Sequence, residues 1–314
     1  MGAPSIHRLL SLTSPGRMPK PLRSLVWRMR SLISRAWNPR MAWQIGRFPC
    51  AIPLGHDLPF IWQNHPLYST AVARIAAFLA ESRADFCAID IGANIGDSAL
   101  LIRNAVDCPI LCAEADPLYF RLLEQNTADL PRVSRVRALL AAESRTLHGC
   151  LERVSGSSRF RQNPSGPSGE TVTLDSVLEG HPAFQHAQLL KTDTDGFDFE
   201  VLRGAETLLR RASPVLHFEF DPTLLAGAGS DPWALMPFLQ DLGYGPALAY
   251  DHTGPLRASL QIAKDNLREM FGAWSHGNPS FYLDLTVFPS VMASHAQEFF
   301  AREQAVLRSP PSAV

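Results

Sequence analysis

The sequence has few cysteines and lacks any long apolar run. Its five cysteines are odd in number and include no C-x-x-C pair, which argues against a disulfide framework or a zinc cage. Cys87 and Cys112 lie inside apolar strand-like runs, so we expect them to be reduced core thiols. No stretch approaches the roughly 18 apolar residues that cross a bilayer, and the start lacks a signal-peptide pattern. We therefore expect a cytoplasmic protein that is neither secreted nor transmembrane.

Acidic residues are missing from the start of the chain. Residues 1–56 contain nine Arg or Lys and no Asp or Glu, although the 314 residues together have a formal net charge of -1. Removing these nine from the 29 basic residues leaves 20 bases against all 30 acids in the remainder. Because such an acidic body repels phosphate, we expect no nucleic-acid partner.

A basic amphipathic helix is predicted within this leader. Apolar residues recur at helical spacing and arginines occupy the positions between them. Such a helix could make peripheral contact, through residues 20–37, with an anionic membrane at its inner surface. It could equally cover an apolar patch of its own domain, or of a second subunit in a homo-oligomer. The apolar residues are Leu22, Leu25, Val26, Met29, Leu32, Ile33 and Ala36.

Strand-like and helical patterns alternate through the body of the chain and predict an α/β fold. Because the strands are apolar on both faces, we expect a mostly parallel, seven-stranded sheet with helices on each face. The predicted strands cover residues 86–91, 110–115, 136–141, 188–193, 215–220, 246–250 and 281–288. The predicted helices cover residues 69–79, 117–126, 199–211 and 233–242.

The expected organisation has three parts. A basic N-terminal extension covers residues 1–65, a catalytic domain covers 66–290, and a C-terminal helix or tail covers 291–314. Within the domain, residues 155–170 are rich in Ser, Gly and Pro, which favours a loop between short strands at 148–154 and 171–174.

The stretch CAIDIGANIGDSALLIR, residues 87–103, is the most informative in the sequence. A predicted strand ends near Asp90 and then turns through Gly92 and Gly96 into a helix. Such a turn in a doubly wound sheet lets the backbone approach a ligand, yet the dinucleotide fingerprint G-x-G-x-x-G is absent. An acid in this place would repel a pyrophosphate. It favours a cationic ligand, such as the amino acid end of S-adenosylmethionine with its ammonium and sulfonium groups.

Glu114 ends the next predicted strand and supports a nucleoside ligand. It follows Asp90 at a spacing close to the roughly 20 residues at which an acid accepts hydrogen bonds from ribose hydroxyls. The alternative is a carboxylate that caps the helix starting at Pro117. The turn upstream favours the ribose interpretation.

Five blocks of the sequence together resemble the FkbM-type class I S-adenosylmethionine-dependent methyltransferases. They are AIDIGANIGD, LCAEADPLYFRLLEQN, TVTLDSVL, LLKTDTDGFDFEVLRGAETLL and VLHFEF, in the family's order, and together they cover about residues 50–290. The resemblance implies a Rossmann-like class I methyltransferase fold. It also implies O-methylation, commonly of a hydroxyl on a sugar, polysaccharide, glycolipid or polyketide. The acceptor is thus expected to be a small molecule or a glycan.

The residues predicted to bind the cofactor follow from the first two blocks. They are Asp90, Gly92, Ala93, Asn94, Gly96, Asp97, Glu114 and Ala115. The chain departs from the family in the fourth block, which in the family often reads K-I-D-V-E-G-x-E. Asp195 and Asp198 stand where the family has Glu, which keeps the charge and shortens the reach.

Charged residues gather near the ends of the fourth and fifth predicted strands, and five of them are predicted to be catalytic. Alternation places Lys191, Asp193 and Asp195 on one face of their strand, and His217 and Glu219 together on one face of the next. A structural pair of Lys191 and Asp193 is an alternative. His217, with a pKa near neutrality, is the predicted general base. Asp193 and Asp195 could instead hold a divalent cation, although no metal site is assigned.

Other classes of protein remain as alternatives. An NAD-dependent oxidoreductase is disfavoured, because both the dinucleotide fingerprint and a Tyr-x-x-x-Lys pair are missing. A non-catalytic scaffold or membrane-associated module could retain the same fold. A methyltransferase that acts on an amine or a protein could share the same cofactor site.

Overall fold

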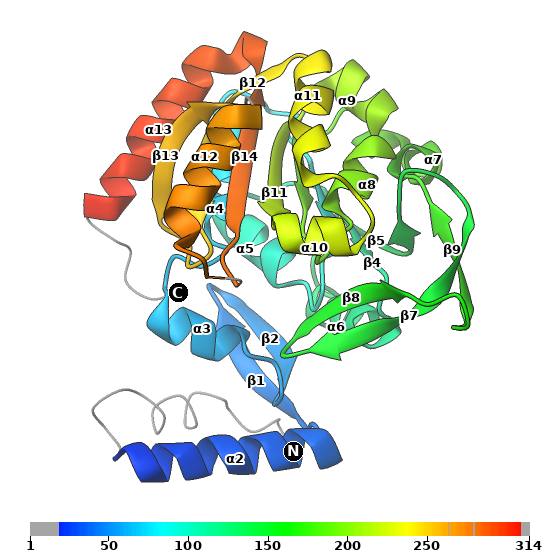
Figure 1. Ribbon diagram of the computed structural model, residues 1–314, viewed down its shortest axis with the longest axis vertical. Helices are drawn as coiled ribbons and strands as arrows, with labels where there is room; N and C mark the ends of the chain where they lie inside the picture. The colour runs from blue at the N-terminus through cyan, green and yellow to red at the C-terminus, as the bar shows by residue number, and fades with distance from the viewer. Residues whose placement is uncertain (1–18, 263, 279, 309–314) are drawn as a thin grey trace.

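A central sheet organises the protein, whose computed structural model describes residues 19–262, 264–278 and 280–308. Within these residues the sheet has eight strands in the order β13-β12-β14-β11-β10-β3-β4-β5 (Figure 1). Five neighbouring strands are parallel. They are β5 (Val133–Arg137), β4 (Ile110–Glu114), β3 (Ala88–Ile91), β10 (Leu189–Thr192) and β11 (Val215–Phe220). The predicted α/β fold with a mostly parallel sheet is confirmed.

Three antiparallel connections extend the sheet beyond β11. They add β14 (Leu283–Pro289), β12 (Tyr244–Asp251) and β13 (Leu256–Gln261). The predicted number of seven strands is wrong, because β13 is an additional strand. It forms an edge of the sheet and alternates buried with exposed residues, so it lacks the continuous apolar run of the central strands.

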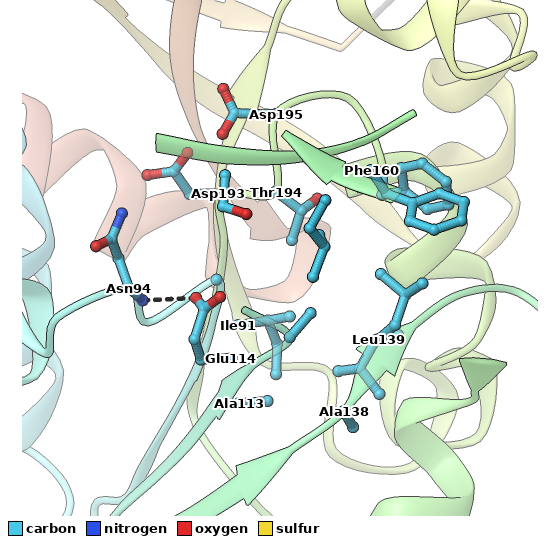
Figure 2. Close-up of a pocket in the computed structure, with 16 residues that line it drawn as sticks. Ile91, Asn94, Ala113, Glu114, Ala138, Leu139, Phe160, Asp193, Thr194 and Asp195 are labelled. Carbon is cyan, nitrogen blue, oxygen red and sulfur yellow. Dashed lines mark hydrogen bonds between the residues drawn. The ribbon is translucent and has the colours of Figure 1, made fainter. Parts of the chain in front are cut away.

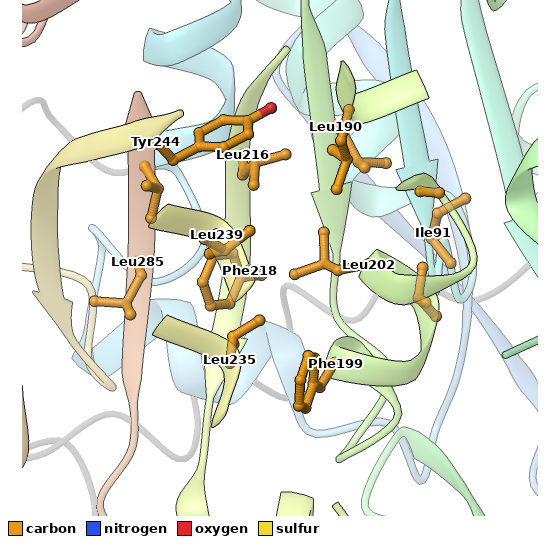
Figure 3. Packing of buried hydrophobic residues seen from close by; sticks show 14 of the residues in the cluster. Ile91, Leu190, Phe199, Leu202, Leu216, Phe218, Leu235, Leu239, Tyr244 and Leu285 are labelled. Carbon is orange, nitrogen blue, oxygen red and sulfur yellow. The ribbon is translucent and has the colours of Figure 1, made fainter. Parts of the chain in front are cut away.

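Helices cover both faces of the sheet, as predicted. One face packs against α7 (Leu174–Glu179), α8 (Asp198–Arg203), α9 (Glu206–Ala212), α10 (Pro222–Gly227), α11 (Leu235–Asp241) and α12 (Lys264–Ser275). The other packs against α4 (Ala71–Ala80), α5 (Asp97–Ala105), α6 (Pro117–Asn126) and α13 (Ala293–Arg308). Figure 3 shows the first face, where Leu202, Leu235 and Leu239 lie against Leu216 and Phe218 of β11. The predicted strand alternation therefore holds in β11.

One predicted helix is divided in two. The sequence predicts a continuous helix over residues 199–211, whereas α8 ends at Arg203 and α9 begins at Glu206. A Cβ on Gly204 would lie 2.2 Å from the carbonyl oxygen of Ala141, so this glycine marks a close approach between two backbones. The interruption between α8 and α9 lets Gly204 pack against the backbone of Ala141. Helical periodicity does not reveal such a contact.

The predicted loop at residues 155–170 is largely a β-hairpin. A second sheet has the order β6-β9-β7-β8, formed by β6 (Leu139–Leu140), β9 (Ser168–Val172), β7 (Thr146–Val154) and β8 (Ser157–Gln162). The loop prediction is wrong for β8 and for the start of β9. No residue of β8 is fully buried, so its polar sequence has no apolar alternation to identify it as a strand.

The first described elements are α2 (Lys20–Ala36), β1 (Arg40–Ile45), β2 (Phe48–Pro53) and α3 (Leu58–Asn64). The predicted helix of the leader is α2. The hairpin and α3 share an apolar cluster with Leu100 of α5 and Leu122 of α6, so residues 41–62 contribute to the core of the fold. The boundary at residue 65 stays a prediction. No helix in the described part of the chain has the length and apolar character needed to cross a membrane.

Candidate active site

The order of the strands determines where a ligand can bind. The chain runs from β3 to β4 and β5 on one side and from β10 to β11 on the other, so the order reverses between β3 and β10. In doubly wound sheets the crevice beyond this reversal is the ligand site. A cleft of about 480 Å³ opens there, with side chains from α3, β8, β10 and β11 in its lining.

The turn after β3 requires glycine at position 92. Gly92 has φ +71°, and a Cβ there would lie 1.9 Å from the carbonyl oxygen of Asp193. The N–H groups of Gly92 and Ala93 both donate to the carbonyl oxygen of Ala113, at 3.0 Å each. Gly96, with φ +91°, then begins α5. Ala93 and Gly96 are buried, so they shape the turn and are absent from the lining of the cleft.

Asp90 lies beneath the turn and not on the surface of the cleft. Its side chain is fully buried, and the Ser98 hydroxyl donates to its Oδ2 at 2.5 Å. Lys191 Nζ lies 3.1 Å from Asp90 Oδ1 and 3.6 Å from Asp193 Oδ2. The structure therefore corrects the expectation that Asp90 faces the ligand. Parallel pairing sets Asp90 beside Lys191, and the lysine, not the aspartate, lines the cleft.

The buried lysine is held in its charged form. Burial by itself would lower the pKa of Lys191, but Asp90, Asp193 and Asp97 raise it above its ordinary value. Lys191 Nζ also donates to the carbonyl oxygen of Gly92 at 3.2 Å. The predicted pairing with Asp193 is thus part of a larger cluster that joins β3, β10 and the glycine turn.

Glu114 supports the turn from the next strand. Its Oε2 accepts a hydrogen bond from the Asn94 N–H at 2.9 Å (Figure 2), and its Oε1 accepts one from the Asp116 N–H at 2.7 Å. Burial raises the pKa of Glu114 to about 7. The cap of α6 is Asp116, which accepts from the N–H groups of Leu118 and Tyr119. The alternative of a helix-capping Glu114 is therefore wrong.

A pocket of about 50 Å³, with both polar and apolar residues in its lining, includes Glu114. Ala115 belongs to its lining, as do the side chains of Leu139 and of Phe160 on β8. Figure 2 shows Ile91, Ala138, Leu139 and Phe160 around the pocket, with the carboxylates of Glu114 and Asp193 on its other side. A carboxylate facing apolar side chains across a pocket suits a ligand with an aromatic ring and hydroxyl groups.

Two predicted catalytic carboxylates lie just beyond β10. Asp193 is 46% exposed, and it lines the pocket beside Glu114 as well as the cleft. Asp195 has φ +52°, and burial followed by the charge of Asp193 raises its pKa to about 6. Asp198 braces their loop, because it accepts hydrogen bonds from Thr192 Oγ1 at 2.8 Å and from the Thr194 N–H at 3.2 Å. The fourth sequence block contained Asp198, but sequence reasoning assigned it no role.

The basicity of His217 differs from the prediction, because its side chain is buried. Its Nδ1 is hydrogen-bonded to Thr286 Oγ1 at 2.9 Å, and burial, with Lys191 and Arg74, lowers its pKa to about 3. The expected pKa near neutrality is therefore wrong, because the neighbouring strand β14 covers the ring. His217 lines a narrow inner cavity of about 30 Å³, and it is absent from the lining of the cleft. Glu219 lines both the inner cavity and the cleft, and burial raises its pKa.

Sequence reasoning missed the residues that bring distant segments to the cleft. His56, before α3, has Nε2 3.4 Å from Asn94 Oδ1, and burial lowers its pKa to about 4. Asn94 Nδ2 donates to the carbonyl oxygen of Gly156, at the tip of the β7–β8 hairpin, at 2.7 Å. Arg159 of β8 also lines the cleft. These residues lie outside any motif, so only the asparagine in the turn offered a signal.

The cleft is rich in negative groups. Lys191 and Arg159 are basic residues in its lining, which also contains five carboxyl groups, those of Asp97, Asp193, Asp195, Glu219 and Asp221. Burial raises the pKa of Asp97 to about 6. In the parts of the chain that the structure describes, no three His, Cys, Asp or Glu side chains are placed to hold a metal ion. The cleft therefore suits an organic cation that can accept or donate hydrogen bonds.

Fold and site together define a doubly wound α/β protein with a nucleoside-sized site at its switch point. The family profile of the Methyltransferase FkbM domain matches residues 90–246, which is half of the chain. The chain therefore belongs to the FkbM methyltransferase family, and this membership makes it an S-adenosylmethionine-dependent methyltransferase with the Rossmann-like class I fold.

Two solved methyltransferase structures are similar to part of this chain. The FkbM methyltransferase of Methylobacillus flagellatus has 12% identity and a TM-score of 0.41, with 65% of this chain and 44% of that chain covered. This chain thus spans less than half the length of that protein. A precorrin-6y C5,15-methyltransferase from Geobacter metallireducens has 13% identity and a TM-score of 0.38, with 69% and 87% covered. No curated protein matches the sequence.

Proposed function

We propose that the protein transfers a methyl group from S-adenosylmethionine to a hydroxyl of a sugar, polysaccharide, glycolipid or related natural product. The observation that carries the cofactor part is the acidic cleft joined, through Asp193, to the small pocket that Glu114 and several apolar side chains line. A nucleoside that bears positive charge complements both parts, because its charge suits the acidic cleft and its base and ribose suit the pocket. When bound, the cofactor supplies an electrophilic methyl carbon.

The residues of the pocket match the adenosine part of this ligand. Glu114 would accept hydrogen bonds from the ribose hydroxyls, and Leu139 and Phe160 would pack on the base. The pocket of about 50 Å³ would hold only part of this ligand, and the rest would extend past Asp193 into the cleft. Asp97 and Asp193 would bind the ammonium group on the side of the cleft.

The acceptor hydroxyl needs a group that removes its proton while it is held in line with the methyl carbon. Neutral His217 is a weak proton acceptor, because its pKa is lowered to about 3. Asp195 is better suited, since its pKa is raised to about 6 and it lines the open cleft. We assign the role of general base to Asp195, with Glu219 as a second carboxylate that orients the acceptor.

The first experiment follows the methyl group. Purified protein is incubated with methyl-labelled S-adenosylmethionine and a cell extract, which is then divided into glycan, lipid and protein fractions. We expect label in the glycan or lipid fraction that survives mild alkali, because a methyl ether is stable where a methyl ester is hydrolysed. Label confined to protein or amines would contradict a hydroxyl acceptor, and cofactor binding with no transfer to any fraction would favour a non-catalytic protein.

A second prediction concerns the pH dependence of transfer. Asp195 must be deprotonated to act, so kcat should rise with pH, with a midpoint no higher than about 6, the pKa that Asp195 has without a ligand, because a bound cation favours its charged form. Asp195→Asn should lower kcat by about 10²–10⁴-fold and remove this rise. Asp97→Asn is the matched control, because burial raises the Asp97 pKa to about 6 as well. It should weaken cofactor binding and keep the rise in kcat; loss of the rise in this variant alone would refute the assignment.

A further inference from the structure

The helix α2 contacts the rest of the protein through one of its faces. The rings of Trp27 and Phe60 lie 4.6 Å apart, centroid to centroid. Arg30 donates to Asp57 Oδ1 at 2.5 Å and to the carbonyl oxygen of Leu54 at 2.8 Å. These contacts attach α2 to the segment that leads into α3. Figure 1 shows the helix at the margin of the molecule, next to β1 and α3.

The opposite face of α2 carries an exposed apolar stripe. At about 3.6 residues per turn, this stripe lies roughly across the helix from Trp27 and Arg30. The adjoining Trp37 is 80% exposed. The predicted stripe therefore does not cover the described part of its own domain. This finding contradicts the alternative that the helix packs its apolar face on a patch of that domain. The stripe consists of Leu22 (47% exposed), Leu25 (51%), Met29 (52%), Leu32 (66%) and Ile33 (40%).

The charges around the stripe indicate what covers it. Arg28 and Arg35 are exposed on one flank of the helix, and Arg40 is exposed just beyond its end. No acidic residue occurs anywhere in residues 1–56. A second α2 packed on the stripe would bring like charges together without a carboxylate to pair them. Anionic phospholipid headgroups would neutralise the arginines while the acyl region receives the apolar side chains.

We propose that the apolar face of α2 is a docking surface for an anionic lipid membrane. An exposed tryptophan next to an apolar stripe is the side chain most suited to the membrane–water boundary. The inference goes beyond the proposed reaction and does not depend on it. Membrane docking would also affect the site. The helix α2 binds the segment around Asp57, and the adjacent His56 and Leu58 line the cleft. Docking would therefore bring the cleft close to the lipid surface.

The test measures co-sedimentation of the full chain with vesicles. We expect binding to mixed phosphatidylcholine–phosphatidylglycerol vesicles and little binding to phosphatidylcholine alone. Raising the ionic strength from about 0.1 M to about 1 M shortens the screening length from about 10 Å to about 3 Å and should weaken binding markedly. Leu25→Glu with Leu32→Glu should lower the partition coefficient at least about tenfold, because two exposed apolar side chains are lost from the stripe.

A matched control separates the stripe from general surface hydrophobicity. Val291 is apolar and 90% exposed, but it lies beside α13 and far from α2 in the sequence. Val291→Glu should bind vesicles like the parent protein. The proposal is overturned if the parent ignores anionic vesicles, or if the double variant binds them equally well. It is also overturned if the double variant converts a dimer to a monomer in light scattering while vesicle binding persists.

Discussion

Lys191→Met should lower the free energy of unfolding by about 3–5 kcal/mol, because it removes one partner of a buried ion pair. Asp90 is fully buried, and Lys191 Nζ lies 3.1 Å from its Oδ1. Without the lysine, the Ser98 hydroxyl remains as the hydrogen-bond partner of that carboxylate. Chemical denaturation followed by circular dichroism measures the change.

A double variant and a surface pair test this explanation. Adding Asp90→Asn to Lys191→Met removes the uncompensated charge, so it should recover part of the lost stability. Arg210→Met breaks an exposed pair with Glu206 and should change stability by no more than about 0.5 kcal/mol. If Lys191→Met lowered the free energy of unfolding no more than Arg210→Met does, the buried ion pair would not stabilise the site as described.

Gly92→Ala should abolish cofactor binding and lower the free energy of unfolding by about 3 kcal/mol or more. The new Cβ would lie 1.9 Å from the carbonyl oxygen of Asp193, in a backbone with φ +71° that disfavours any side chain. Relief of the clash must separate the glycine turn from the loop after β10. That movement displaces Asn94 and Asp193 together. Calorimetric titration with S-adenosylmethionine and a denaturation curve measure the two effects.

Gly227→Ala is the control for the glycine substitution. Outside its chain neighbours and the backbone of its own helix, no heavy atom lies within 4 Å of a Cβ built at Gly227, the last residue of α10, which lacks the backbone conformation that requires glycine. The free energy of unfolding of the Gly227→Ala variant should change by no more than about 0.5 kcal/mol, and its cofactor affinity should equal that of the parent protein. Tight binding by Gly92→Ala would show that the turn can relax, and would contradict its assigned role in forming the site.

The acidic lining of the cleft has a general consequence for ligand binding. Burial raises the pKa values of Asp97 and Asp195 in the cleft to about 6, and that of Glu114 in the adjoining pocket to about 7, so these groups are partly protonated near neutral pH. A cationic ligand favours their charged forms. The protein thus holds carboxylates whose charge is compensated only incompletely by Lys191 and Arg159, and a cation would complete that compensation.

Several features of the site could be predicted from local sequence because they depend on neighbouring residues. The turn at Gly92 and Gly96 follows an apolar strand, and both glycines adopt the positive φ that their residue type suggests. Glu114 occupies the end of the adjacent strand and reaches the same turn. The alternation in β11 correctly separated Phe218 from His217. In each case the relevant contact lies within one strand, one turn or one pair of consecutive strands.

Other features depend on residues that are distant in sequence. Asp90 is buried away from the surface of the cleft, and β10 places Lys191 beside it as the residue that lines the cleft. The expected basicity of His217 failed, because β14 covers it and removes water from the ring. The strand β7 was predicted in part, but β8 was missed because this exposed strand has no apolar periodicity, yet the hairpin that it forms brings Arg159 and Gly156 to the cleft.

The amino-acid pattern alone thus determined the α/β architecture, the glycine turn, the acidic strand ends and the amphipathic character of the leader. Periodicity and residue type carry that information because they record which side of an element avoids water. Tertiary structure decided which carboxylates line the cleft, how burial shifts their pKa values, and that the apolar stripe of α2 faces away from the described part of its domain. These properties arise from desolvation and contact between segments far apart in the chain, which no local pattern encodes.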